Sequence, residues 1–547
     1  MMDPYTEPKH PQPAGILLIN ALIHTLDDRR PTAAALAVNE GRILAVGATD
    51  DLLAEFGGRF EVEDLHGLVL LPGLTDAHLH LQHYALERTM VDCETATRAE
   101  CLQRVAERAR LTPPGEWIRG YGYNQNAWPD GPGSAADLDA AAPHNPVYIT
   151  HKSLHSAWVN HAAVRLAQLT HATSDPPGGR LGRGPDGIPD GILYESAMDL
   201  VANLIPRPSD HQLVEAIREA LPLLWRVGLT GVHDFDRRDC FFALQTLHAA
   251  GELRLRVVKS IPLEDLSSAA SLRLRTGFGD DMLQIGPVKI FMDGALGPQT
   301  AAMLAPYEGT VDDRGILMMD AGQLFEHARL ASENGLSLAV HAIGDRAVRE
   351  VLDAYQQLRA YERDHLGTPD LRHRIEHVQV IHPADAGRLA VLNVIASMQP
   401  IHATSDMSMA DRQWGRRAGL AYAWRAQLEQ GARLAFGSDA PVESPNPFLG
   451  LHAAVTRRRA DGLPGEEGWH PEQRLSLLEA LHAFTTGPAY AAGMEGRLGK
   501  LAPGYLADLI VLEVDPFSCD PHELRFIQPL LTMVGGEWVF CHGGAKW

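Results

Sequence analysis

Short apolar segments recur through the middle of the chain, and several are followed by a stretch with apolar residues at three- to four-residue spacing. The segments are residues 68–76, 228–236, 253–261, 284–293, 335–342, 371–380, 394–400 and 432–439. Alternation of strand and helix is typical of a parallel sheet, because parallel strands need a long crossover connection. A run of eight such units predicts an α/β fold of the (β/α)8, or TIM, barrel type.

Two further regions fall outside this alternation. Residues 16–47 and 507–541 are rich in Ile, Leu and Val and are interrupted by glycine turns, so we expect β structure near both ends of the chain. This predicts a small discontinuous β-sandwich domain, residues 1–69 with 496–547, and a barrel domain of residues 70–495. The connection between the first and second barrel strands is far longer than an ordinary loop. It predicts an inserted lid or substrate subdomain at about residues 90–205.

The charge balance restricts the partners of the chain. There are 48 Lys and Arg against 69 Asp and Glu, a formal net charge of −21 at pH 7. An acidic surface repels polyanions, so we expect no nucleic acid and no membrane partner. No apolar run approaches the roughly 18 residues of a membrane-spanning helix, and residues 1–15 lack the basic start and apolar core of a signal peptide. The five cysteines form no CxxC pair, which favours a reducing, cytoplasmic location over a disulfide framework.

Polar residues that can bind a metal ion stand at the C-terminal ends of several predicted strands. His78 and His80 are two apart in one strand, so their side chains share a face. In a TIM barrel the C-terminal strand ends converge on one site. The residues that would meet there are His78, His80, Lys289, His341, His377 and Asp439. Four imidazoles, a carboxylate and a lysine inside an apolar run predict a divalent-metal site.

These residues, in this order, resemble the signature of the amidohydrolase superfamily. The chain more closely resembles the amidohydrolase-3, YtcJ-like branch, which includes N-substituted formamide deformylase. The matching phrases are WIRGYGYNQ at 117–125, PGGR at 177–180, HAIGD at 341–345, SMQP at 397–400 and GSDAPVE at 437–443. The resemblance extends from about residue 16 to residue 541, which is nearly the whole chain.

The resemblance implies a role for each residue of the predicted metal site. His78, His80 and Asp439 would hold one divalent metal ion, and His341 and His377 would hold a second. Lys289, carboxylated by carbon dioxide, would bridge the two ions. A carbamate offers two oxygens and a negative charge, and its formation needs a neutral lysine, which burial favours. The expected metal is zinc. The alternative is a single metal ion per chain, with Lys289 extending towards water or paired with Asp293.

The resemblance also implies a reaction. It implies a metal-dependent hydrolase that cleaves a C–N amide-type bond (N-acyl, N-formyl or cyclic amide) of a small organic molecule. A metal-bound hydroxide would attack the carbonyl, with Asp439 as general base and then general acid. One alternative is a mononuclear deaminase of a heterocycle. Deaminases of this superfamily carry a Glu three residues after the fifth-strand histidine, where this chain has Gly344, and this disfavours deamination. A third possibility is a catalytically inactive binding protein on the same barrel.

Other polar and aromatic residues admit two interpretations. His155, in the inserted subdomain, and Gln399, at the end of the seventh strand, are candidate substrate contacts or ordinary structural groups. Asp76 is expected to orient its neighbours rather than bind metal. Tyr123, Trp128 and Trp158 are expected to form the core of the inserted subdomain rather than a pocket wall. The remaining histidines carry no assigned function, and a homodimer is the expected assembly.

Overall fold

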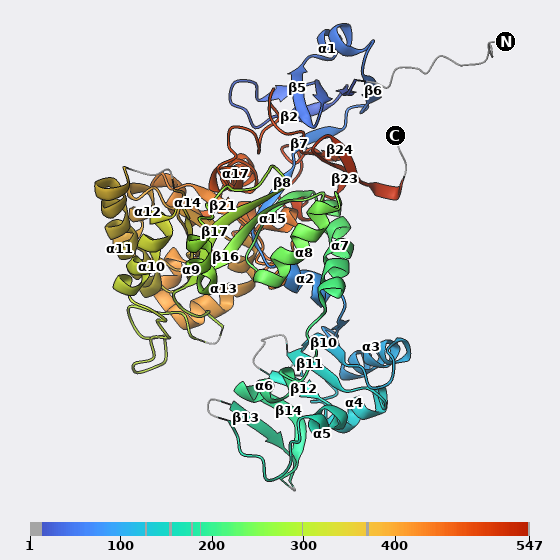
Figure 1. Cartoon of the computed structure of the whole chain (residues 1–547), viewed down its shortest axis with the longest axis vertical. Coiled ribbons are helices and arrows are strands. Elements are labelled where there is room, and N and C mark those ends of the chain that lie inside the picture. Colours follow the sequence, from blue (N-terminus) through green and yellow to red (C-terminus); the bar gives the residue numbers. More distant parts are fainter. Residues whose placement is uncertain are drawn as a thin grey trace, which may run out of the picture. The chain divides into compact units, whose positions relative to one another are not determined.

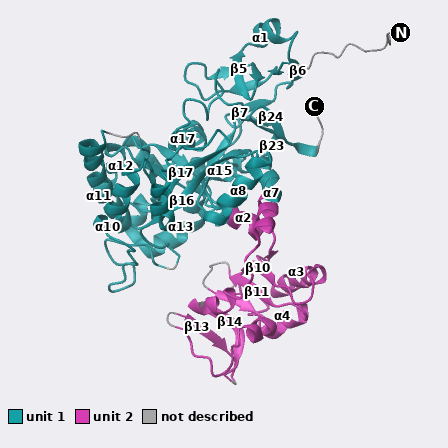
Figure 2. Cartoon of the chain, in the orientation of Figure 1, with its two compact units in different colours: residues 1–81, 218–547 teal, residues 82–217 magenta. Residues whose placement is uncertain are grey.

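The computed structural model describes residues 14–125, 128–151, 156–176, 179–185, 187–297, 299–367 and 371–544. The chain divides into two compact units (Figure 2): residues 1–81 with 218–547, and residues 82–217. The first unit contains an eight-stranded, a four-stranded and a six-stranded sheet, and the second unit contains another six-stranded sheet. Within these described ranges, no helix combines the length and the apolar character that crossing a membrane requires.

The eight-stranded sheet is the predicted barrel (Figure 1). Its strands follow one another in chain order, and every hydrogen-bonded pair of neighbours is parallel. They are β8 (Leu74–Leu79), β15 (Leu229–Asp234), β16 (Arg256–Pro262), β17 (Leu283–Phe291), β18 (Leu338–Ala342), β19 (Arg374–His377), β20 (Ile395–Met398) and β21 (Leu434–Phe436). Parallel strands that are buried on both faces have apolar residues at successive positions, so these strands could be predicted from apolar segments of the sequence. The predicted α/β barrel is confirmed.

Backbone hydrogen bonds after β21 close the barrel against β8. The Asp439 N–H donates to the His78 carbonyl at 2.7 Å, and the His80 N–H donates to the Ala440 carbonyl at 2.8 Å. These two bonds lie at the C-terminal ends of the first and last strands. Barrel closure therefore sets the positions of His78, His80 and Asp439 relative to one another.

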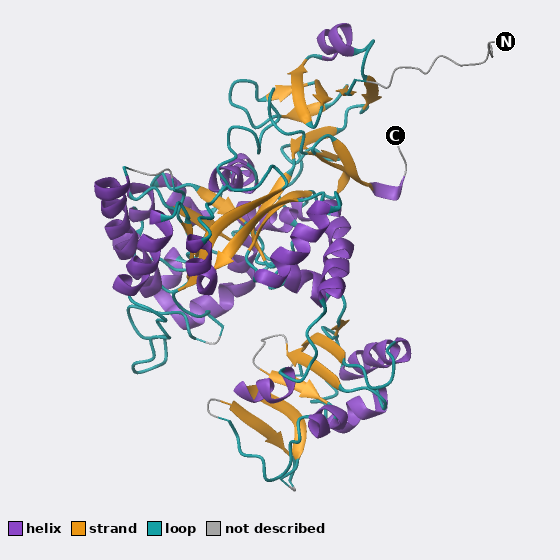
Figure 3. Ribbon diagram, viewed as in Figure 1, coloured by secondary structure: helices purple, strands orange, loops and turns teal. Residues whose placement is uncertain are grey.

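Helices surround the barrel strands (Figure 3). They include α8 (Arg238–Ala249), α9 (Leu266–Ser271), α10 (Ala321–Glu333), α11 (Asp345–Tyr361), α12 (Arg388–Val391), α13 (Pro400–Trp414), α14 (Trp424–Glu429), α15 (Pro447–Thr456), α16 (Leu477–Phe484) and α17 (Thr486–Ala491). Asp320 and Gln323 cap the start of α10 reciprocally, and Pro400 opens α13 at a position where a missing N–H costs nothing. In α11 the buried residues recur at three- to four-residue spacing, as in Val348, Val351 and Tyr355.

The two ends of the chain build the smaller sheets of the first unit. One sheet has the order β5-β4-β1-β6, and the other has the order β24-β23-β22-β7-β2-β3. The strands are β1 (Ile16–Ile19), β2 (Leu22–His24), β3 (Thr32–Ala33), β4 (Ala35–Asn39), β5 (Arg42–Gly47), β6 (Glu61–Asp64), β7 (Val69–Pro72), β22 (Leu509–Leu512), β23 (Pro529–Val534) and β24 (Glu537–Cys541). Both sheets contribute to one apolar core, with Leu18 and Leu36 from the first and Ile23, Leu70 and Val511 from the second.

The apolar run of residues 68–76 serves two sheets rather than one. β7 pairs with β2 and β22 in the terminal sheet, whereas β8 begins at Leu74 in the barrel. Gly73 separates them, and a Cβ at this position would lie 2.3 Å from the Thr230 side chain on β15. The sequence predicted a single barrel strand here, because hydropathy does not reveal which sheet a buried residue joins.

A buried ion pair links the barrel to the terminal sheets. Arg256, at the start of β16, donates through Nε and Nη2 to the two carboxylate oxygens of Asp508, at 2.5 and 2.7 Å. Asp508 also accepts the Gly535 N–H at 2.8 Å. Both charged side chains are buried. The arginine and the carboxylate form two parallel hydrogen bonds, and both carboxylate oxygens accept a hydrogen bond. This geometry best offsets the free-energy cost of removing two charges from water.

The second unit is a mixed sheet with the order β13-β14-β12-β11-β10-β9. Its strands are β9 (Val91–Asp92), β10 (Ile118–Tyr123), β11 (Val147–His151), β12 (Ser156–Val159), β13 (Gly179–Arg183) and β14 (Pro189–Glu195), with helices α3 (Arg98–Leu111), α4 (Ala135–Ala141) and α5 (His161–Leu166). Tyr123, Trp128 and Trp158 are buried together with Val105 and Ile149 in one apolar cluster. These aromatic side chains form a core, as their sequence context indicated.

Candidate metal centre

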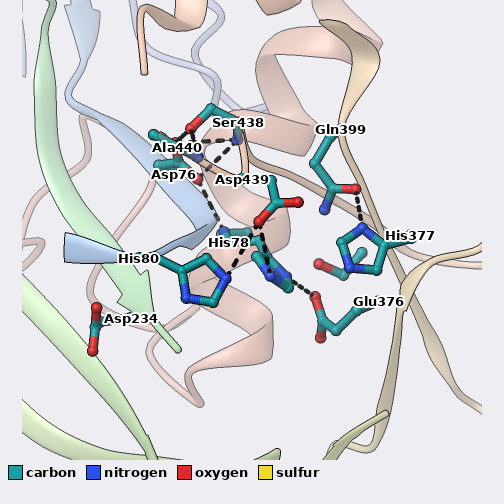
Figure 4. Close-up of polar contacts among 12 residues, drawn as sticks. Asp76, His78, His80, Asp234, Glu376, His377, Gln399, Ser438, Asp439 and Ala440 are labelled. Carbon is teal, nitrogen blue, oxygen red and sulfur yellow. Dashed lines mark hydrogen bonds and ion pairs between the residues drawn. The ribbon is translucent and has the colours of Figure 1, made fainter. Parts of the chain in front are cut away.

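The six residues of the predicted metal site lie at the C-terminal ends of barrel strands. They are His78 on β8, His80 directly after it, Lys289 on β17, His341 on β18, His377 at the end of β19 and Asp439 after β21. Ring centroids lie 4.9 Å apart for His78 and His377, and 4.5 Å apart for His341 and His377. One candidate ligand atom from each of His78, His377 and Asp439 lies within 4.8 Å of the other two. The fold therefore brings the predicted residues together, and Figure 4 shows His78, His80, His377 and Asp439.

Buried carboxylates orient His78, on β8, and His80, directly after it. His78 Nδ1 lies 2.6 Å from Glu376 Oε2, and His80 Nδ1 lies 3.3 Å from Asp236 Oδ1. Because an ionised carboxylate only accepts hydrogen bonds, each Nδ1 carries a proton, and Nε2 is the nitrogen that presents a lone pair whenever the ring is neutral. Both Nε2 atoms face Asp439 Oδ1, at 3.5 and 3.4 Å. Among the described residues, His78 Nε2 has no hydrogen-bond partner although it is buried.

His377 and His341 are held by neutral acceptors. His377 Nδ1 lies 2.8 Å from Gln399 Oε1, which fixes Nε2 as its lone-pair nitrogen. His341 is reversed: its Nε2 donates to the Gly294 carbonyl at 3.0 Å, so its lone pair is at Nδ1. Burial, followed by the charge of Lys289, lowers the pKa of His341 to about 3, which keeps this ring neutral. A neutral imidazole is the form that binds a metal ion.

Lys289 is a buried lysine with no carboxylate partner within the described part of the chain. Its Nζ lies over the rings of Phe235 and Phe291, 4.7 and 4.8 Å from their centroids. Burial lowers the pKa of Lys289 to about 8. The other buried barrel lysine, Lys259, differs because its Nζ lies 3.0 Å from Asp234. Of the two, Lys289 is the amine without an ion-pair partner among the described residues.

The alternative partner for Lys289 is engaged elsewhere. Asp293 accepts backbone N–H groups from Ala302 at 2.9 Å, Ile343 at 3.0 Å and Gly344 at 2.8 Å. No ion pair between Lys289 and Asp293 occurs among the described contacts. The pairing that the sequence left open is therefore absent, and Asp293 instead ties the loop after β17 to the loop after β18.

Asp439 is an ionised carboxylate at the centre of the cluster. Burial opposes ionisation, but hydrogen bonds with His402 and His80 and the charges of nearby histidines hold the pKa of Asp439 well below its usual range. Its backbone has φ of 62°, and that of His377 has φ of 77°. A left-handed backbone conformation is strained at residues other than glycine, and such residues occur more often at functional sites.

The sequence profile of the Amidohydrolase family matches residues 61–540. The chain belongs to the amidohydrolase family. It is 32% identical to the YtcJ protein of Bacillus subtilis (strain 168), over 95% of this chain and 98% of that protein. It is 29% identical to the N-substituted formamide deformylase of Arthrobacter pascens, over 96% of this chain and 98% of that enzyme.

A solved structure shares the fold of this amidohydrolase over most of its length. It is an uncharacterized metal-dependent hydrolase from Pyrococcus horikoshii OT3, with a TM-score of 0.78 and 28% sequence identity over 92% of this chain and 99% of that one. The predicted family, the barrel and the class of enzyme, a hydrolase of carbon–nitrogen bonds other than peptide bonds, are confirmed. The metal ion and its number, the lysine carbamate and the homodimer stay predictions.

The amidohydrolase centre also contains a buried Arg–Glu pair whose role the sequence did not reveal. Arg374 donates through Nε at 2.5 Å and Nη2 at 2.9 Å to Glu376, the carboxylate that holds His78. Arg374 also donates to the Ala77 carbonyl and to Ser397 Oγ. Both charged side chains are buried. Their signal in the sequence was the two-residue spacing of Arg374 and Glu376, which places both on one face of β19.

His402 is a second residue that the sequence left without a role. It lies in the first turn of α13, directly after β20, and its Nε2 is 3.4 Å from Asp439 Oδ2. Burial alone lowers the pKa of an imidazole, but Asp439 raises that of His402 to about 9. The sequence feature that could have indicated His402 is its position two residues after Pro400, where a helix begins at the C-terminal edge of the barrel.

The remaining candidates have distinct positions. Asp76 accepts from Ser438 Oγ at 2.5 Å and from the His78 N–H at 3.0 Å, so it orients the segments that carry His78 and Asp439. Gln399 binds His377, and its Nε2 is buried without a hydrogen-bond partner in the described ranges. His155 lies outside the described residues.

Proposed function

We propose that this amidohydrolase cleaves an amide-type C–N bond of a small organic molecule at a divalent-metal centre, for which zinc is the expected ion. The observation that carries the proposal is the orientation of the ring nitrogens. Three histidines have Nδ1 held by protein acceptors, so Nε2 is the nitrogen that would bind a metal ion, and the fourth has the reverse arrangement. Imidazole and carboxylate donors suit zinc and similar ions.

The donor set fits a cation. His78 Nε2 is buried without a hydrogen-bond partner among the described residues, and a buried unpaired acceptor is costly. Burial alone would lower the pKa of His80, yet Asp236 and Asp439 on its two sides raise it to about 10, so this position favours positive charge. The ions would be held by His78, His80, His341, His377 and Asp439. A bound divalent ion would supply a Lewis acid for the carbonyl and would acidify water.

Lys289 would bridge two ions as a carbamate. A neutral lysine amine adds to carbon dioxide and releases one proton, which leaves a carboxylated nitrogen with one negative charge. Two features support this assignment: burial lowers the pKa of Lys289 to about 8, and no described carboxylate competes for its Nζ. With one ion alone, Lys289 would remain an uncarboxylated amine.

Asp439 would move the proton. Water attacks the amide carbon, Asp439 accepts the water proton, and the same proton then passes to the nitrogen that leaves. A C–O bond forms, the C–N bond breaks, and the products are a carboxylic acid and an amine. Gln399 Nε2, which lacks a described partner, is the proposed donor to the substrate carbonyl.

Amide hydrolysis is favoured over deamination by the space around residue 344. A Cβ on Gly344 would lie 2.0 Å from the Ala302 carbonyl oxygen. The glutamate that deaminases of the superfamily carry three residues after the fifth-strand histidine therefore has no room here. Because a relative of this chain is a formamide deformylase, N-formyl amides are the first substrates to test.

The experiment is a panel of N-formyl, N-acyl and cyclic amides and one amino-heterocycle, tested with metal-loaded protein whose metal content is measured. We expect release of amine from at least one amide and a loss of about a thousandfold or more in kcat for Asp439→Asn. We expect no loss for Asp353→Asn, a control on α11 whose half-exposed carboxylate pairs with Arg388. Ammonia release from the heterocycle alone would support the deaminase. Turnover by Asp439→Asn at the wild-type rate would refute the assigned base.

A further inference from the structure

Two arginines and two histidines meet on the first unit away from the metal centre. They lie where α15 packs against the short helix η7 (Leu524–Phe526) of the C-terminal segment. Arg458 Nη1 contacts His522 Nε2, and the His522 ring centroid lies 5.8 Å from that of His452. Arg525 Nη1 lies 3.5 Å from His452 Nε2. The four side chains thus form one continuous cluster.

None of the four side chains forms an ion pair with a carboxylate in the described part of the chain, although Asp520 accepts the backbone N–H of His522 at 2.8 Å. Neither Arg458 nor Arg525 forms an ion pair there, although the chain has 69 acidic residues against 48 basic ones. His452 is 2% exposed. Burial, then the charges of Arg525, His522 and Arg458, lowers the pKa of His452 to about 4, and no acidic group counters them. Positive charge gathered without a counter-ion is unfavourable, and a bound anion would relieve it.

The geometry excludes a metal ion and favours an anion. Two guanidinium groups repel cations. Arg458 uses Nη1 on His522 and Nε on the Gly462 carbonyl, at 3.4 Å, and Arg525 uses Nη1 on His452, so each planar fork keeps further donors. Arg525 is also held in place, because its guanidinium stacks on Phe526 with the carbon 4.5 Å from the ring centroid. Preorganised arginine forks match the oxygens of a tetrahedral oxyanion.

We propose that Arg458, Arg525, His452 and His522 bind a phosphate-type oxyanion, as inorganic phosphate or as the phosphate group of a small monoester. The arginines donate to two of its oxygens, and the imidazoles contact the guanidinium groups. The site lies at the far end of α15 from the loop that carries Asp439, and it does not depend on the proposed reaction.

The test is a calorimetric titration of the full chain with inorganic phosphate and, separately, with glycerol phosphate, against chloride at equal ionic strength. We expect saturable binding of phosphate, weakened about tenfold or more in Arg458→Gln and in Arg525→Gln, since each variant loses charge-assisted hydrogen bonds. Arg459→Gln is the matched control, because Arg459 lies next to Arg458 in the sequence but is already paired with Asp461. It removes the same charge and is expected to leave binding unchanged.

The source of the anion follows from the two ligands: tighter binding of the monoester indicates a phosphorylated small molecule, and equal or tighter binding of phosphate indicates the free ion. Melting curves without phosphate show whether each variant folds, and Arg525→Lys, which keeps charge but loses the fork, provides a milder second variant. Phosphate that binds no better than chloride would overturn the proposal. Equal weakening by Arg459→Gln would also overturn it, because binding would then reflect net charge alone.

Discussion

The substitution Glu376→Gln separates the orientation of His78, a proposed metal ligand, from the stability of the barrel. Glu376 accepts from His78 Nδ1 at 2.6 Å and from Arg374 at 2.5 and 2.9 Å. Glutamine has nearly the same shape, but it has one acceptor oxygen and an amide group that donates. At least one of the three donors that face residue 376 then loses its acceptor, and the buried Arg374 loses its counter-charge.

The magnitude follows from this geometry. Removing one partner of a buried ion pair costs about 3–5 kcal/mol of stability. Loss of a carboxylate that orients a metal-bound histidine weakens metal binding about 10- to 100-fold, or about 1.4–2.7 kcal/mol. The two effects have different readouts, because the stability change persists in metal-free protein whereas the affinity change concerns His78.

Two measurements are needed on each protein. Urea unfolding of metal-free wild type and variant gives the free energy of unfolding, and zinc titration against a competing chelator gives the affinity. Glu333→Gln is the control, because Glu333 forms an ion pair with Arg329 at the surface of α10. We expect it to cost less than about 1 kcal/mol and to leave zinc affinity unchanged. Zinc affinity within twofold of wild type in folded Glu376→Gln would refute the orienting role of Glu376.

Two other predictions concern single charged groups. Wild type supplied with carbon-13 bicarbonate is expected to show a carbamate signal and to bind about two metal ions, whereas Lys289→Gln should lose the signal and bind about one, because the bridge between the ions is gone. Two bound ions in Lys289→Gln, measured by elemental analysis, would contradict the bridge. Asp508→Asn is expected to lower the free energy of unfolding by about 3–5 kcal/mol, since Arg256 stays buried without its partner. Arg256→Gln combined with Asp508→Asn should cost less than the sum of the two single changes, and additive costs in urea unfolding would contradict the coupling.

The sequence predicted the barrel and its polar strand ends because both depend on short-range rules. Apolar runs mark parallel strands that are buried on both faces. His78 and His80 share a face because they are two residues apart. A parallel barrel then places the ends of all eight strands at one rim, so His341 and Asp439 could be assigned to the same site without knowledge of any contact.

The orienting residues depend on contacts that no short-range rule reveals. Glu376 lies in a predicted strand, but its partner His78 is 298 positions away in the sequence, and only the closed barrel brings the two together. Strand alternation would place Glu376 and His377 on opposite faces, yet both contact the same centre. The positive φ of His377 breaks the alternation at the strand end, and a sequence pattern gives no sign of it.

Phe235 contacts two buried cations, Arg374 and Lys289, and of these Lys289 is the one suited to lose its proton. The ring stacks on His78 with centroids 4.2 Å apart, and it contacts Arg374 and Lys289, at 5.3 and 4.7 Å from its centroid. Arg374 has Glu376 as a two-pronged counter-ion, whereas Lys289 has aromatic faces and no described carboxylate. An arginine does not lose its proton in a protein, and a buried lysine does. The fixed positive charge therefore stabilises the carboxylate that orients His78, and the removable one leaves a neutral amine beside the metal centre.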